Sequence, residues 1–309
     1  MNSPASRRVI IDCDPGIDDA LALLLAAGLP DVELLAVTAV AGNRPVHTTA
    51  LNARRVLDLA GLAAVPVYAG ASRPFGYAAA RCNLVHGEDG LGGVALPAAG
   101  QVASGHAAIR LAELLAAAPA GTIDLVAVGP LTNLALCEML APGSLARARR
   151  LLVMGGALRV PGNITPAAEF NFFADPAAAR MVCEAGAELL LFPLDVTGQA
   201  VMHPDWIAGF ASAANACGRA AGAMLEAYAL LDPLLHDACP VAWLARPDLF
   251  QAEECHLQVD WRDGPSAGHV QAWFGGRDDS PGAFNVRAMT ALDNDGLLAL
   301  VADAIGRLP

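Results

Sequence analysis

The sequence contains no lysine, and all of its 19 basic residues are arginine. A Schiff-base lysine and the phosphate-binding lysine of a P-loop are therefore excluded. Acidic residues number 31, so the formal net charge is −12, and no run of basic residues occurs anywhere in the chain. Nucleic acids and anionic membranes repel such a surface, so we expect neither as a partner.

The seven cysteines are odd in number, scattered, and never spaced as CxxC. This pattern predicts neither a disulfide framework nor a zinc site. No apolar stretch of signal-peptide length precedes the first acidic cluster. The apolar run over residues 20–30 is shorter than the roughly 18 residues that a membrane helix needs. We therefore expect a reduced, cytoplasmic protein with no membrane contact.

Hydrophobic residues make up 55% of the chain, which is enough for a large core. β-Branched apolar segments alternate with helical ones through the first two thirds of the sequence. The expected strands are 8–12, 32–40, 65–70, 122–129, 149–156 and 187–195. The expected helices are 18–28, 45–60, 107–118, one from 131, and 176–186. This order predicts an α/β fold, with a mostly parallel central sheet flanked by helices as in a Rossmann-like core.

The pattern changes after about residue 200. Alanine-rich segments at 204–231 and 239–246 are expected to be helical, and alternating strands follow at 254–261 and 268–274. These strands predict a small antiparallel appendage near the C-terminus. No internal repeat or low-complexity linker occurs, so we expect a single domain over residues 1–309.

Four carboxylates follow the first predicted strand, at Asp12, Asp14, Asp18 and Asp19. Like charges this close repel, so a proton or a cation must be present. Asp18 and Asp19 also suit the first turn of a helix, which explains only two of the four. Oxygen ligands favour Ca²⁺ or Mg²⁺ over zinc or copper. Because ligands bind at the carboxyl ends of parallel strands, we expect a hard-cation site there.

Other strand ends carry polar groups. Asn43 follows the second strand, although alone it would be interpreted as a turn residue. The Gly-Pro break after Val128 is expected to expose a backbone carbonyl. Glu169 and Asn171, two apart in a segment expected to be extended, would point the same way and could hold vicinal hydroxyls.

Several segments together resemble the inosine-uridine-preferring nucleoside hydrolases. They are, in order, DCDPGIDDALALLLA, VTAVAGN, VHGEDGLGG, VAVGPLTNLA, VMGGA, GNITPAAEFNFFADP and HDACPVAWL. The first and the EFNxxxDP segment are specific in combination, and the resemblance fades beyond residue 250. It implies an α/β fold, a tightly bound Ca²⁺, hydrolysis of the N-glycosidic bond of ribonucleosides, and a homodimer or homotetramer.

The resemblance also implies roles for individual residues. It implies metal ligation by Asp14, Asp19, the backbone carbonyl of Val128, and Asp237. Asp14 is also the implied general base for the attacking water, and His236 lies near the departing base. The implied ribose-binding residues are Asp18, Asn163, Glu169 and Asn171. Asn43 lies beside the metal, His86 and Tyr228 lie on the base side, and Asp12 lies behind the ligands.

The implied chemistry agrees with the residues. A carboxylate-rich site stabilises an oxocarbenium-like sugar, as in glycoside hydrolysis. The same acidic, lysine-free site would repel a 5′-phosphate, which favours nucleosides over nucleotides. Tyr228 falls where pyrimidine-preferring members resemble one another, whereas Met224 departs from their usual glutamine. We expect a preference for pyrimidine ribonucleosides such as uridine and cytidine.

Two other functions fit part of the pattern. A haloacid-dehalogenase-type phosphatase also carries DxD after its first strand, but it normally uses a basic residue, often lysine, on the phosphoryl group. A calcium-dependent nucleoside- or sugar-binding protein without catalysis would be expected to have replaced Asp14, Asn171 or Asp237. All three are present.

Overall fold

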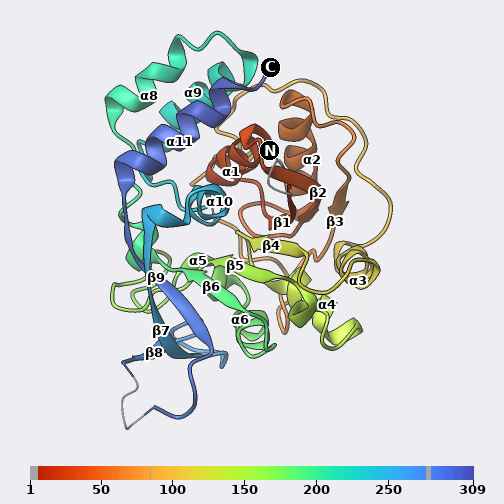
Figure 1. Ribbon diagram of the computed structural model, residues 1–309, viewed down its shortest axis with the longest axis vertical. Coiled ribbons are helices and arrows are strands. Elements are labelled where there is room, and N and C mark those ends of the chain that lie inside the picture. Colours follow the sequence, from red (N-terminus) through yellow and green to blue (C-terminus); the bar gives the residue numbers. More distant parts are fainter. Residues whose placement is uncertain (1–5, 84, 276–279) are drawn as a thin grey trace, which may run out of the picture.

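The computed structural model describes residues 6–83, 85–275 and 280–309. Within these residues one nine-stranded sheet has the order β3-β2-β1-β4-β5-β6-β9-β7-β8 (Figure 1). The strands are β1 (Arg7–Cys13), β2 (Val32–Ala39), β3 (Val67–Ala69), β4 (Ile123–Ala127), β5 (Arg150–Met154), β6 (Leu189–Phe192), β7 (Phe250–Val259), β8 (Val270–Phe274) and β9 (Val286–Leu292).

Strands β1 to β6 and β9 are parallel. Their short runs are apolar on both faces, and β4 and β6 are buried along their whole length. Burial of both faces is typical of a sheet covered by helices on each side. The predicted α/β class with a mostly parallel sheet is confirmed.

Helices cover both faces of the sheet (Figure 1). One face carries α1 (Ile17–Gly28), α2 (Val46–Leu59), α8 (Pro204–Ala211), α9 (Ala216–Tyr228), α10 (Ala238–Ala245) and α11 (Asn294–Gly306), whose apolar residues join one core cluster. The other face carries α3 (Ala107–Ala117), α4 (Thr132–Leu140) and α6 (Pro176–Cys183), which form a second cluster. Two shorter helices are α5 (Phe170–Ala174) and α7 (Leu194–Thr197). Within the described residues, no helix has the length and apolarity to cross a bilayer.

The C-terminal third differs in part from the expectation. Strands β7 and β8 are antiparallel as predicted, but β9, which was not predicted, pairs parallel with β6 and antiparallel with β7. The antiparallel part therefore continues the main sheet. The segment 204–231, expected to be helical, forms two helices, because the chain breaks between α8 and α9. There the side chain of Asn215 accepts the Gly218 N–H at 2.6 Å and starts a new helix.

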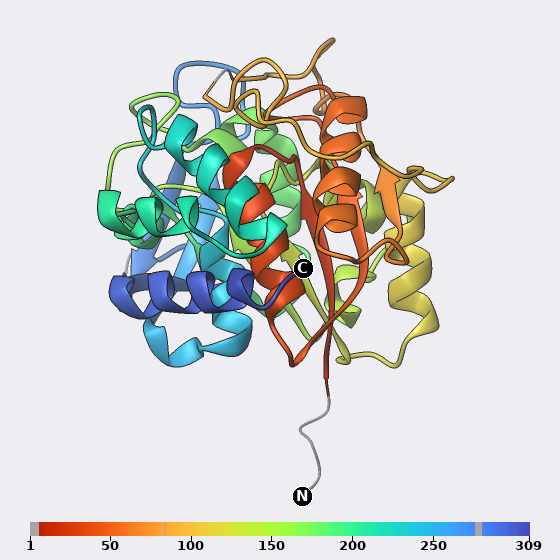
Figure 2. The ribbon, with the colours of Figure 1, turned by 90° about the horizontal axis from the view of Figure 1, so that it is seen from above.

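The order of the strands reverses at β1: β2 and β3 lie on one side of β1 in the sheet, and β4, β5 and β6 lie on the other side. Strand β1 pairs with β2 on one edge and with β4 on the other. A ligand crevice is expected outside the carboxyl ends of two such strands. Figure 2 shows the loops after the parallel strands, with the long connection between β3 and α3, gathered at one end of the molecule.

Candidate active site

A cavity of about 220 Å³ lies at the carboxyl ends of β1, β4 and β5. It is lined by eleven of the residues predicted for the site: Asp14, Asp18, Asn43, His86, Val128, Asn163, Glu169, Asn171, Tyr228, His236 and Asp237. Asp19, the remaining one, does not line the cavity. The walls of the cavity also include Asn83, Asp232 and the exposed apolar side chains of Val85, Ile164 and Leu231. The fold thus brings residues more than 200 positions apart into one place.

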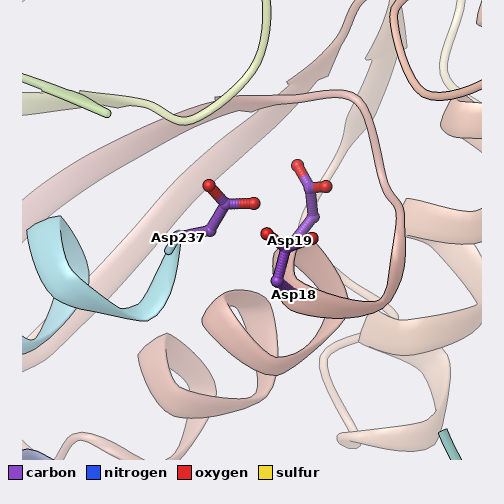
Figure 3. A group of neighbouring side chains, drawn as sticks. All are labelled: Asp18, Asp19 and Asp237. Atoms are coloured by element: carbon purple, nitrogen blue, oxygen red, sulfur yellow. The ribbon is translucent and has the colours of Figure 1, made fainter. Parts of the chain in front are cut away.

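Three buried carboxylates converge beside this cavity. Carboxylate oxygens of Asp18, Asp19 and Asp237 lie within 4.8 Å of one another. Figure 3 shows Asp237, at the start of α10, facing Asp18 and Asp19 in the first turn of α1. Burial raises the pKa of Asp237 well above its usual range, and the charges of Asp18 and Asp19 add to this. The pKa of Asp19 is raised to about 7, first by burial and then by Asp18. This group contains Asp18, where the implied ligand set has Asp14.

Asp14 is fixed between two loops. Its Oδ2 accepts the backbone N–H of Asn43 at 2.6 Å, and its own N–H donates to Asp19 Oδ1 at 3.1 Å. The carboxylate fits only because both loops carry glycine: a Cβ on Gly42 would lie 2.1 Å from Oδ2, and one on Gly129 would lie 2.6 Å from Oδ1. Burial and the charge of Asp19 raise the pKa of Asp14 well above its usual range.

Asp19 and Asp18 have different surroundings despite being neighbours. Asp19 Oδ2 accepts the N–H of Gly16 at 2.9 Å and the side-chain amide of Asn43 at 3.1 Å, so it caps α1 from within. Asp18 Oδ1 is buried and has no hydrogen-bond partner among the described residues; His86 Nε2 lies 3.7 Å from it. A buried carboxylate oxygen without a partner is costly and suits a position next to a cation.

Asp12 lies behind the cavity and does not line it. Its side chain is fully buried, and Oδ1 accepts the Thr38 hydroxyl at 2.5 Å and the Asn133 side-chain amide at 2.8 Å. Its Oδ2 has no partner among the described residues. Burial raises the pKa of Asp12 to about 7. Asp12 cannot contact a ligand in this cavity.

Glu169 and Asn171 both face the cavity, but not for the reason that the sequence suggested. The segment is not extended: Glu169 is the N-cap of α5, and its carboxylate accepts the N–H groups of Asn171 at 2.7 Å and Gly156 at 2.9 Å. Asn171 donates its side-chain amide to the carbonyl of Val128 at 2.8 Å. The Val128 carbonyl keeps a second lone pair. Asn163 is exposed, and its Oδ1 accepts the Phe170 N–H at 2.9 Å.

Two aromatic rings form another wall. His86 stacks on Tyr228 with ring centroids 5.1 Å apart. His86 Nδ1 accepts the N–H of Ile17 at 3.1 Å, so the proton of the neutral ring is on Nε2. Burial lowers the pKa of His86 to about 4. Met224, which stands where pyrimidine-preferring members usually have glutamine, is fully buried in the core and does not line the cavity.

His236 is held from both sides of its ring. Nδ1 lies 2.8 Å from the Thr197 hydroxyl, and Nε2 lies 3.3 Å from Asp232 Oδ2. Burial lowers the pKa of His236, but the hydrogen bond and charge of Asp232 and the charge of Asp18 outweigh it, so the pKa is raised.

Three polar residues of the site were missed by the sequence analysis. Thr197 and Asp232 hold His236, and Asn83 donates its side-chain amide to Asn43 Oδ1 at 2.7 Å. Asp232 precedes His236 by four residues, but both lie in the irregular segment between α9 and α10, where a spacing of four does not place side chains on one face as it does in a helix. For Thr197 and Asn83 the sequence holds no signal, because each contact joins segments about 40 residues apart in the chain.

Comparisons with known proteins agree with this geometry. Residues 9–299 match the family model described as inosine-uridine preferring nucleoside hydrolase, well beyond residue 250 where the motif resemblance fades. The chain is 37% identical over 308 residues to the pyrimidine-specific ribonucleoside hydrolase RihB of Escherichia coli, covering 97% of each chain. Among solved structures it resembles a plant nucleoside hydrolase, PpNRh1, with a TM-score of 0.89 and 28% identity over 97% of this chain and 98% of that one. It resembles a purine-preferring ribonucleoside hydrolase from Gardnerella vaginalis with the same TM-score and coverage and 27% identity.

Proposed function

The chain belongs to the inosine-uridine preferring nucleoside hydrolase family and hydrolyses ribonucleosides, and we propose that it does so with a bound calcium ion and a preference for pyrimidine nucleosides. The family resemblance of its motifs is thereby confirmed. The observation that carries the calcium proposal is the convergence of Asp18, Asp19 and Asp237 beside the cavity.

The residues present fit a hard cation. The groups that converge here are carboxylates, whose oxygens Ca²⁺ prefers, and Asp18 Oδ1, which has no hydrogen-bond partner among the described residues, is a buried acceptor that a cation would satisfy. The residues that would hold it are Asp14, Asp19, Asp237 and the carbonyl of Val128, with Asp18 adjacent. When bound, calcium would supply positive charge that neutralises these carboxylates and acidifies a nearby water.

Asp14 is the proposed general base. Asp14 lines the cavity; its Oδ2 accepts the Asn43 N–H, and among the described residues no donor contacts its Oδ1. Oδ1 is therefore the atom that would accept the proton of the attacking water. A base fixed in this way contributes a factor of about 10² to 10⁴ to the rate.

The ribose end of the cavity is acidic. Asp18, Glu169, Asn171 and Asn163 are the proposed partners of the sugar hydroxyls, and all line the cavity. Their carboxylates would also stabilise positive charge that develops on the sugar as the glycosidic bond breaks. Asn43 orders this end by contacting both Asp14 and Asp19.

The nucleobase is proposed to lie near the stacked rings of His86 and Tyr228, because planar aromatic walls suit planar bases. His236, held beside them, is the proposed group near the departing base. The preference for pyrimidines is supported by the 37% identity to a relative named as pyrimidine-specific.

The phosphatase alternative does not fit the site. Its nucleophile would be the first aspartate of the DxD motif, which is Asp12 near the end of β1, and this side chain is fully buried and hydrogen-bonded to Thr38 and Asn133. The chain also has no lysine for a phosphoryl group.

We further propose that residues 1–309 form one domain, which the continuous sheet supports. The homodimer or homotetramer and the cytoplasmic location remain predictions from the sequence.

Ribose release from uridine, cytidine, inosine and adenosine tests the proposal. Exhaustive chelation should abolish release, and Ca²⁺ should restore it better than Mg²⁺. Asp237→Asn should lose activity and calcium binding, whereas Asp205→Asn, an exposed aspartate on α8, should keep both. Full activity after chelation would refute the metal requirement, and faster release from inosine than from uridine would refute the pyrimidine preference.

A further inference from the structure

Asp232 occupies a position at the cavity that the chemistry described so far does not use. It lines the cavity, and its side chain is 26% exposed, in contrast to the buried carboxylates of the acidic cluster. It follows α9 in a turn closed by its own N–H, which donates to the carbonyl of Tyr228 at 2.9 Å. Asp232 is therefore attached to the helix end that carries the aromatic wall.

The two oxygens of Asp232 differ. Oδ2 lies 3.3 Å from His236 Nε2, whereas among the described residues Oδ1 has no hydrogen-bond partner. An ionised carboxylate only accepts hydrogen bonds, so Nε2 donates to Oδ2 whether the histidine ring is neutral or charged. Thr197 occupies the other ring nitrogen at 2.8 Å. Both ring nitrogens of His236 thus have a protein partner, whereas Asp232 Oδ1 has none among the described residues.

We propose that Asp232 is a specificity-determining residue whose Oδ1 accepts an N–H from the base edge opposite the glycosidic bond. This inference rests on the proposed function. The ligand class is ribonucleosides whose base presents a donor there, such as the ring N3–H of uracil or the exocyclic amine of cytosine. The stacked His86 and Tyr228 would hold the face of the base, while Asp232 reads its edge.

The expected discrimination follows from the cost of leaving a charged acceptor without its donor. A hydrogen bond to a charged group at a partly buried position is worth about tenfold to a hundredfold in binding or rate. A site built around such a bond rejects an analogue that lacks the donor. A residue that only positioned His236 would slow each parent nucleoside and its donor-free analogue by the same factor.

The test pairs each substrate with an analogue that lacks the donor: uridine with 3-methyluridine, and cytidine with its 4-deamino analogue. The measurement is kcat/KM for ribose release by the wild type and by Asp232→Ala. The wild type should prefer the parent nucleoside in both pairs, and Asp232→Ala should reduce that preference about tenfold or more in at least one pair. The 4-deamino analogue adds no bulk, so its result does not depend on a clash.

Two control variants separate the alternatives. Thr197→Val removes the other partner of His236, so it should lower rates without changing either ratio. Glu226→Ala removes the same charge from an exposed position on α9 and should change neither rate nor ratio. Unchanged ratios in Asp232→Ala, with measurable activity, would overturn the role of Asp232 and leave it as a positioning residue. If the wild type released no ribose from any parent nucleoside, the proposed function itself would be refuted.

Discussion

Removing bound metal should make the stability of the folded protein fall as the pH rises from about 4 to about 7. Asp12 carries this expectation, because burial raises its pKa to about 7 and it is not among the proposed ligands. A carboxyl whose pKa is raised in the folded state is protonated in both states at low pH. As the pH rises past the unfolded pKa of about 3.9, only the unfolded state ionises, so stability is lost until the folded pKa is passed.

The size of the effect follows from the shift. A difference of about 3 pKa units corresponds to roughly 4 kcal/mol of unfolding free energy per group at about 1.4 kcal/mol per unit. In a protein of this size, this amounts to a change of roughly 8 °C in Tm. Asp19, with a pKa also raised to about 7, should act in the same direction. Added calcium should flatten the dependence, because a cation favours the ionised carboxylates.

The measurement is Tm in chelator at pH 5 and pH 8, for the wild type, Asp12→Asn and Asp31→Asn. The asparagine at position 12 can still accept from Thr38 and Asn133 but cannot ionise, so its Tm should fall less with pH than that of the wild type. A buried amide without an acceptor costs about 1–3 kcal/mol at every pH, so the slope and not the level is informative. Asp31 is exposed, and its replacement should leave the slope unchanged. If the slope of Asp12→Asn equalled that of the wild type, the assigned role of its ionisation would be wrong.

Three further outcomes are expected. Asp14→Asn should lower kcat by about 10² or more with a smaller change in KM, and a near-normal kcat would mean that another group activates the water. Gly42→Ala places a Cβ 2.1 Å from Asp14 Oδ2, so kcat should fall at least about tenfold as the base shifts. The matched Gly209→Ala, which meets no atom within 4 Å, should keep kcat, and equal rates for the two variants would contradict the close-packing argument. His236→Ala should reduce kcat/KM for inosine more than for uridine. Tyr228→Phe should do the reverse. Equal losses for both substrates in His236→Ala, together with weaker calcium binding, would leave His236 as a support for Asp237.

The parallel core could be predicted because its signals are local. Each short apolar strand is followed by its own polar residues, and the rule that parallel strands expose their carboxyl ends at one edge placed Asp14, Asn43 and Val128 together. Strand β9 could not be placed in this way. Its partner β6 is almost 100 residues earlier in the chain, and the pairing of Leu190 with Arg287 depends on the folded arrangement.

The sequence predicts which residues form the site better than it predicts the contacts that these residues make. The prediction that Glu169 and Asn171 face the same way was correct, but the extended backbone behind it was wrong, because the Glu169 carboxylate starts a helix. Met224 lies on the expected helix, yet its side chain is buried in the core, and small alanine and glycine side chains around α9 leave the rotation of the helix about its axis weakly specified by the sequence. The contacts of Asp232 and Thr197 with His236 depend on the path of loops.

The acidic cluster needs more positive charge than the fold itself supplies. Three carboxylates within 4.8 Å repel by about 3 kcal/mol or more per pair at an effective dielectric constant of about 20. The N-termini of α1 and α10 both face the cluster, and each contributes about 0.3–1 kcal/mol of stabilisation to a nearby negative charge. Two helix ends therefore offset well under half of the repulsion among three ionised pairs. Without a cation at least one carboxyl keeps its proton at neutral pH, and then the ribose end of the cavity presents a donor where acceptors for hydroxyl protons are required. A divalent cation at this position removes the conflict, because all three carboxylates can then ionise together.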